Sequence, residues 1–124
     1  MDLRIDIELQ GSVLLVTASG PVSLDTALWL LKEAFDAAKE KEVSKILVNT
    51  FAVTGALSTF ERYTLGVEVA AYLRLREMNP RVAFVGKLPT TDGFGVRVAQ
   101  NRNVTAEVFS SQEEALNWLA NWPG

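Results

Sequence analysis

The first part of the chain alternates apolar and charged residues with the period of a half-buried β-strand. Charged side chains separate four apolar ones, which stand at every second position: Leu3, Ile5, Ile7 and Leu9. This period of two is typical of a strand that packs one face on a core. Gln10-Gly11 supplies a turn before an apolar run over residues 13–18, so we expect a hairpin that ends at Gly20-Pro21.

Helical spacing begins after Ser23, whose hydroxyl group is a good N-cap. The apolar residues that follow predict a helix with one face on the core: Leu24, Ala27, Leu28, Leu31, Ala34, Phe35 and Ala38. Trp29 and Leu30 lie off this predicted stripe, and Trp29 falls on the side that carries acidic residues. We therefore expect Trp29 either to contact a partner or to pack along the sheet edge or against Trp118 or Trp122.

Strands and helices alternate along the rest of the chain. Apolar runs indicate three more strands, the first buried on both faces, over residues 44–49, 81–86 and 105–109. Helices are predicted over residues 58–78, around 93–101 and from about 110 onwards. We expect a single α/β domain over residues 1–124, with a mixed sheet of about five strands and about four helices.

The composition of the chain narrows its chemistry. Among its 124 residues there is no cysteine and no histidine, so thiol chemistry and the usual general base at neutral pH are both missing. The net charge of −3 gives no broad attraction to nucleic acid. No apolar run is long enough for a membrane span, and the charged N-terminus is unlike a secretory signal. We expect a cytoplasmic protein that is not an enzyme and has no metal site or cofactor.

The predicted helix over residues 58–78 is apolar on more than one side. Its apolar residues do not fit one narrow stripe: Phe60, Tyr63, Leu65, Val67, Val69, Ala70, Ala71, Tyr72, Leu73 and Leu75. The cover could be the sheet with a neighbouring helix, a second subunit in a homodimer, or a small apolar ligand. Gly66 costs helix stability at this position, which a close helix contact or a bend would explain.

Hydroxyl groups gather where the strand over residues 44–49 leads into this helix. The segment Ser58-Thr59-Phe60-Glu61 has the spacing of a capping box, in which Ser58 and Glu61 each bond the other's backbone amide. A hydroxyl group at a helix start is also a suitable place for a phosphate. The two interpretations are compatible. The candidates for binding a partner or a phosphate here are Asn49, Thr54, Ser58 and Thr59.

A second loop, over residues 87–95, carries candidates for anion binding. Thr91 or Asp92 is placed to cap the following helix, with Lys87 and Arg97 nearby to supply positive charge. The loop lacks the Gly-Lys-Ser/Thr ending of a P-loop and the third glycine of a dinucleotide fingerprint. We therefore do not expect a nucleotide site.

The strand, the loop and the Ser/Thr pair at the helix start resemble the STAS domain, the fold of anti-sigma-factor antagonists. Asn49 stands where that family has an Asp near the strand end, and Leu57-Ser58-Thr59-Phe60 stands at its Asp-Ser-Ser-Gly motif. The resemblance places the family's phosphorylatable serine at Thr59. Leu57 replaces a polar neighbour, and Phe60 replaces a glycine and should crowd the corner. These replacements argue against a phosphorylation switch.

The chain is also similar to the divergent SpoIIAA-like branch, which is related to STAS domains and to the lipid-binding Sec14 fold. The opening hairpin, the segment 94–102 and the ending 108–119 carry this similarity. It implies a fold more than a chemistry. We expect a regulatory or protein-binding module, forming a homodimer through its apolar helices; the alternative is a carrier of a small apolar or lipid ligand.

Overall fold

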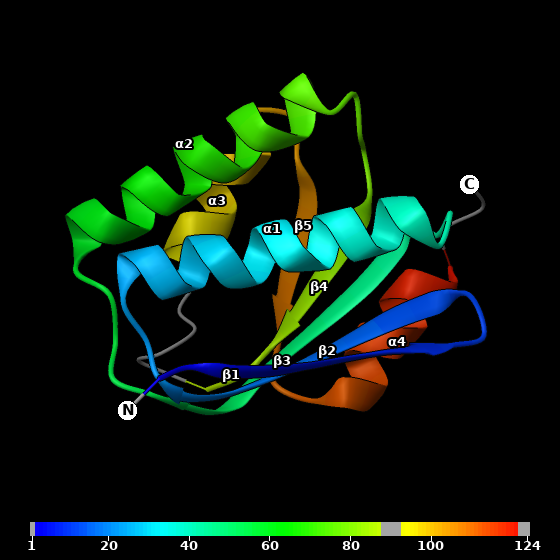
Figure 1. Ribbon diagram of the computed structural model, residues 1–124, viewed down its shortest axis with the longest axis horizontal. Coiled ribbons are helices and arrows are strands. Elements are labelled where there is room, and N and C mark those ends of the chain that lie inside the picture. The colour runs from blue at the N-terminus through cyan, green and yellow to red at the C-terminus, as the bar shows by residue number, and fades with distance from the viewer. Residues whose placement is uncertain (1, 88–92, 122–124) are drawn as a thin grey trace.

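The computed structural model describes residues 2–87 and 93–121. Within them the chain forms five strands, β1 Arg4–Gln10, β2 Val13–Pro21, β3 Lys45–Thr54, β4 Arg81–Val85 and β5 Thr105–Phe109. The same residues contain four helices, α1 Leu24–Glu40, α2 Thr59–Leu75, α3 Phe94–Gln100 and α4 Gln112–Ala120 (Figure 1). The α/β class and the order of elements predicted from the sequence are confirmed.

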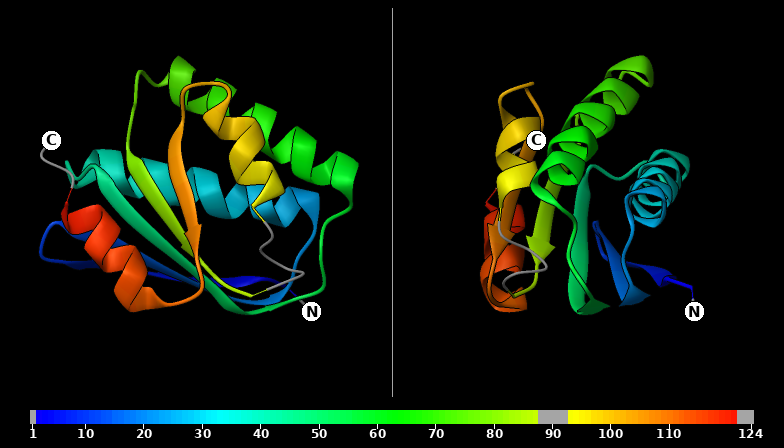
Figure 2. Two further views of the ribbon diagram at one scale, coloured as in Figure 1. Left: turned by 180° about the vertical axis from the view of Figure 1, so that it is seen from behind. Right: turned by 90° about the vertical axis from the view of Figure 1, so that its left-hand side faces the viewer.

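The strands form one mixed sheet in which sequence order equals spatial order, β1-β2-β3-β4-β5. β1 and β2 are the antiparallel hairpin, and each later strand runs parallel to the one before it. Because the parallel part grows in one direction, crossovers of one hand place α1, α2 and α3 on the same face of the sheet. α4 follows the last strand and covers the opposite face (Figure 2).

The sheet separates two cores. The alternation of side chains along β3 shows this directly: Ile46 and Val48 belong to the core beneath α1, α2 and α3, whereas Leu47 belongs to the core beneath α4. All three are buried, so the predicted burial of this strand on both faces is confirmed.

The strand β3 is longer than its apolar run indicated. It was expected to end at Asn49, but it continues to Thr54 because β2 also continues, and Pro21 pairs with Thr54 beyond an irregularity in register near Ser19. Thr, Phe and Val side chains in the added segment favour extended backbone. Asn49 and Thr54 therefore both lie within the strand, and the loop before α2 is short.

α1 buries more of its surface than the predicted stripe. Leu30 was placed off the core-facing side, but only 5% of it is exposed. The reason is that α2 lies beside α1, so α1 is covered by a helix as well as by the sheet (Figure 1). Leu24 and Leu28, which were placed on the inner face, are only half-buried.

α2 packs against α1 and α3, on the same face of the sheet as these two helices (Figure 2). A Cβ atom at Gly66 would lie 2.7 Å from the carbonyl oxygen of Gly95 and 2.8 Å from Val98 Cβ, so the predicted close helix contact is confirmed. The outer side of α2 is open to solvent at both ends, where Phe60 is 75% exposed and Leu75 is 84% exposed. No helix in the described ranges is both long and apolar enough to cross a membrane.

Candidate functional site

The start of α2 is a complete capping box. Ser58 is the N-cap in extended conformation, and its Oγ accepts from the Glu61 backbone amide at 3.1 Å. The Glu61 carboxylate in turn accepts from the Ser58 amide at 2.8 Å. This confirms the capping interpretation, and such a cap stabilises a helix by about 1 kcal/mol. One acceptor position of the Ser58 hydroxyl group is therefore used in holding the helix start.

Two exposed aromatic side chains follow this cap in the first two turns of α2. Phe60 is 75% exposed and Tyr63 is 44% exposed, one turn apart on the outer side of α2. The expectation that Phe60 crowds this corner is therefore wrong, because the side chain extends into solvent. Thr59 is also exposed, and its hydroxyl group lies 3.5 Å from an Nη atom of Arg62. We call Ser58, Thr59, Phe60 and Tyr63 the helix-start surface.

α3 and the turn after it contribute a cation to this surface. The Arg102 guanidinium group lies 5.6 Å from the centre of the Tyr63 ring and donates to the Tyr63 hydroxyl group at 3.3 Å. A cation near an aromatic face adds attraction and restricts the ring. The surface is therefore aromatic, with a positive charge beside it. Nothing in the sequence linked Arg102 to Tyr63, because the contact depends on how α3 packs on α2.

The two β3 candidates lie apart from each other and have different surroundings. The Asn49 amide nitrogen lies 3.4 Å from Gln112 Oε1 of α4, and its Oδ1 accepts from the Phe51 amide at 2.9 Å. Asn49 thus faces the α4 side of the sheet, while Ser58 opens a helix on the other side. Thr54 is exposed at the end of β3, where its carbonyl oxygen accepts from the Val22 amide at 3.1 Å.

Trp29 is 43% exposed on α1. The alternative that it packs on Trp118 is wrong, because α1 and α4 cover opposite faces of the sheet. Trp118 instead lies 5.5 Å from the Phe109 ring and beneath the Arg81 guanidinium group at 3.6 Å. Trp122 lies outside the described residues. Partner contact by Trp29 stays a prediction.

The second loop is described only in part. Thr91 and Asp92 fall outside the described residues. The N-cap of α3 is Gly93, with φ of 85° and no side-chain cap, in place of the predicted Thr91 or Asp92. That left-handed conformation favours glycine. Lys87 and Arg97 are both exposed, and an anion site there stays a prediction.

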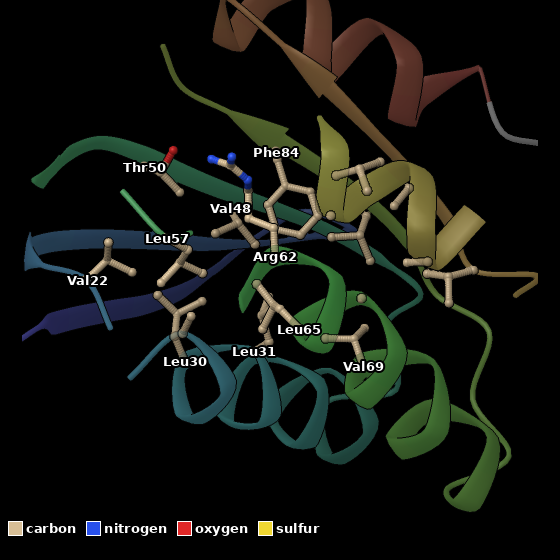
Figure 3. A pocket seen from close by; sticks show the side chains of 18 of the residues that line it. Val22, Leu30, Leu31, Val48, Thr50, Leu57, Arg62, Leu65, Val69 and Phe84 are labelled. Atoms are coloured by element: carbon tan, nitrogen blue, oxygen red, sulfur yellow. The ribbon is translucent and has the colours of Figure 1, made fainter. Parts of the chain in front are cut away.

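An apolar pocket lies between the sheet and the three helices on its α1 side. Its volume is about 150 Å³. Figure 3 shows side chains converging on it from the strands and from α1 and α2, including Val48, Phe84, Leu30 and Val69. Thr50 and Arg62 contribute the polar atoms, and Leu57 joins from the short loop before α2. The sequence raised a small apolar ligand as one possible cover of this helix, but it did not indicate which residues would line a pocket for it.

A cluster of hydrogen-bonded polar side chains joins α1 and α2. The Tyr72 hydroxyl group donates to Asp36 Oδ1 at 2.5 Å, and Arg76 bonds the same carboxylate oxygen. Burial alone raises the pKa of Asp36, but the hydrogen bonds from Tyr72 and Arg76 outweigh it and hold the pKa below its usual value. The bond to Asp36 raises the pKa of Tyr72. The cluster is structural, and it fixes the spacing of the two helices above the pocket.

The described residues, 2–87 and 93–121, contain no group of three acidic side chains placed to hold a metal ion. In the helix-start surface, the Ser58 hydroxyl group caps α2 and the Tyr63 hydroxyl group accepts a hydrogen bond from Arg102. The arrangement is therefore suited to binding through exposed aromatic groups.

Solved structures share the fold of this chain over nearly its whole length. A crystal structure of an anti-sigma factor antagonist from Mycobacterium paratuberculosis matches with a TM-score of 0.64 and 14% identity, covering 97% of this chain and 96% of that one. The unphosphorylated form of the anti-sigma factor antagonist SpoIIAA matches with a TM-score of 0.55 and 12% identity, covering 96% and 100%.

A protein from Shewanella loihica, uncharacterized but described as having a SpoIIAA-like fold, matches with a TM-score of 0.53 and 20% identity, covering 94% of this chain and 93% of that one. No protein-family model matches the chain, and no curated protein is similar enough to count as a relative. The chain thus has the STAS-type, SpoIIAA-like fold, as its sequence indicated. A relation to Sec14 stays a prediction.

Proposed function

We propose that this protein is a non-enzymatic, cytoplasmic regulatory module that binds another protein at the helix-start surface. One observation carries the proposal: Phe60 and Tyr63, two large aromatic side chains, are exposed in the first two turns of α2. Exposed aromatic residues are the usual anchors of protein interfaces. Two of the similar structures are of anti-sigma factor antagonists, which supports a regulatory role.

The partner we propose has an apolar recess for the Phe60 ring and an acidic group at its edge. Phe60 can enter a recess because 75% of it is already exposed and no core contact has to break. The acidic group would face Arg102, whose guanidinium group already lies over Tyr63. A rim charge of this kind raises the association rate more than the final affinity.

Binding in this proposal does not depend on phosphorylation. Ser58 Oγ accepts a hydrogen bond from the Glu61 backbone amide in the helix cap. Leu57 and Phe60 stand where the STAS motif has Asp and Gly. Thr59 is the exposed hydroxyl group at this position. Thr59→Glu is therefore expected to change partner affinity no more than Thr59→Gln does. A partner lost with glutamate and kept with glutamine would establish a charge-controlled switch instead.

The main test compares Phe60→Ser with Leu9→Ser. Both remove an exposed apolar side chain, but Leu9 lies on β1, 44% exposed, in the hairpin at the sheet edge. Proteins crosslinked to the tagged wild-type chain in its own cells are quantified, and the one enriched is purified for calorimetry. We expect Phe60→Ser to weaken its affinity at least tenfold, since an aromatic anchor contributes 2 kcal/mol or more. Equal affinities for both variants would refute the proposed surface.

A homodimer through α2 is a separate proposal. Its outer side carries apolar residues at helical spacing, with Val67 and Ala71 half-buried between Phe60 and Leu75. Leu75, at 84% exposure, lies at the far end from the helix-start surface. We expect a dimer mass by light scattering at micromolar concentration and a monomer for Leu75→Ser. A wild-type monomer under these conditions would refute the dimer and leave the partner-binding proposal unaffected.

A further inference from the structure

The pocket beneath α2 follows from how three helices meet. α2 is held against α3 at Gly66, where the absence of a side chain lets the Gly95 backbone approach. On its other side, α2 is tied to α1 by the bonds from Tyr72 and Arg76 to Asp36. Because α2 is fixed by α3 on one side and by α1 on the other, it does not pack closely on the strands, and a space of about 150 Å³ remains above Val48. Interiors are otherwise close-packed, so a space of this size is unusual.

The lining is apolar apart from two residues. Thr50 contributes a hydroxyl group, which donates to the Val85 carbonyl oxygen at 3.0 Å. Arg62 is the only charged residue among the described residues that line the pocket, and one of its Nη atoms also donates to Thr59 Oγ1 at 3.5 Å. Figure 3 shows its guanidinium group directed towards the end of the pocket where Thr50 lies. A guanidinium group presents several donors in a planar fork that matches a carboxylate.

We propose that this pocket binds a small monocarboxylate with a single apolar ring. The ring would lie between Val48 and Val69, and its carboxylate would bond Arg62. Size supports a ring, because an engineered apolar cavity of about 150 Å³ is known to bind benzene. Size also argues against a whole lipid, which the sequence had raised as an alternative. The apolar lining lies beneath α2, away from the helix-start surface, whereas Arg62 contacts both the pocket and Thr59.

The experiment uses benzoate as the probe and benzyl alcohol as its neutral match in shape. Binding to the full chain is followed by titration of backbone amide NMR shifts. We expect shifts at residues that line the pocket, and at least tenfold tighter binding of benzoate than of benzyl alcohol, which is typical of a hydrogen bond to a charged group. Arg62→Gln should remove that preference while keeping the binding of benzyl alcohol.

Two variants on one helix separate the pocket from the surface. Val69→Phe places a ring inside the pocket, whereas Val67→Phe adds the same ring to the outer side of α2. We expect Val69→Phe to abolish binding of both probes and Val67→Phe to bind like the wild-type chain. If Val69→Phe fails to fold, Arg62→Gln still decides the role of the cation.

Three results would overturn the inference. The first is an absence of shifts at pocket residues up to about 10 mM benzoate, a concentration that still detects weak ligands. The second is equal affinity for benzoate and benzyl alcohol, which would remove the assignment of a carboxylate to Arg62. The third is undiminished binding to folded Val69→Phe, which would place the probe elsewhere.

Discussion

The contact between α2 and α3 at Gly66 is tight enough to reverse the usual effect of a glycine substitution. In a helix interior, Gly→Ala gains about 1 kcal/mol from helix propensity. Here the added Cβ would lie 2.7 Å from the Gly95 carbonyl oxygen and 2.8 Å from both Val98 Cβ and Val98 Cγ1. One of these atoms belongs to the backbone, so a rotamer change cannot relieve the contact. α3 as a whole would have to move.

Overpacking of this kind costs about 1–3 kcal/mol and occasionally more. A contact this short belongs towards the upper part of that range, so the cost exceeds the gain in propensity. We expect Gly66→Ala to be destabilised by a net 1–2 kcal/mol, roughly. For a domain of this size, that lowers the unfolding midpoint by about 3–8 °C.

The assay is urea unfolding followed by circular dichroism, with thermal unfolding beside it. Gly95→Ala is the matched control, because it also adds a helical methyl group, yet its Cβ would lie 3.3 Å from the Arg62 carbonyl oxygen. That contact needs a shift of only a few tenths of an ångström, so Gly95→Ala should be clearly less destabilised. A Gly66→Ala protein more stable than the wild type would show that α3 moves at little cost, and the reasoning would fail.

Three further predictions concern single contacts. Asp36→Ala should lower the free energy of unfolding by less than about 1 kcal/mol at pH 7, because the ion pair with Arg76 is more than one-third exposed. The folded-state pKa of Asp36 is lowered, so this contribution is present above the usual pKa of an Asp and is lost as the pH falls through the folded-state value. Urea unfolding at pH 7 and pH 2.5 should show the difference between the two proteins shrink, and a constant difference would contradict it. Arg81→Ala removes a cation over the Trp118 ring and a 2.9 Å hydrogen bond to the Trp118 carbonyl oxygen. It should therefore lower the free energy of unfolding by about 1–3 kcal/mol and alter tryptophan fluorescence, with Arg81→Lys intermediate. Equal stabilities of the two variants would argue against planar stacking of the guanidinium group on the ring. Ser58→Ala should lower the free energy of unfolding by about 1 kcal/mol because the helix cap is lost, and Ser58→Asp should restore most of that stability. Chemical unfolding measures both values, and two equally destabilised variants would contradict a capping role.

Interactions local in sequence were predictable. The N-cap at Ser23 and the capping box at Ser58 follow from residues close in sequence, and both are formed. The hairpin and the positions of the strands and helices follow from periods of two and 3.6 residues within single segments. The resemblance to STAS domains, based on the junction at Ser58 and the order of elements, indicated the same fold.

Features that depend on distant segments were not predictable. β3 runs past Asn49 because β2 offers backbone partners as far as Pro21, and the apolar pattern of β3 alone contains no sign of that. Leu30 is buried because α2 lies beside α1. Asp36 accepts a hydrogen bond from Tyr72, which lies on another helix 36 residues further on. Each case needed the placement of a second element.

The apolar pattern of α2 becomes intelligible only when its sides are separated. Val69 and Leu73 face the core, Gly66 meets α3, and Phe60 and Leu75 face solvent. A helix with one buried side shows a single stripe of apolar residues. A helix that covers a pocket and also has an apolar outer surface needs apolar residues on several sides. The missing stripe was therefore a sign of several roles. The same helix provides both sites proposed above, and Val69 and Phe60 allow them to be tested separately.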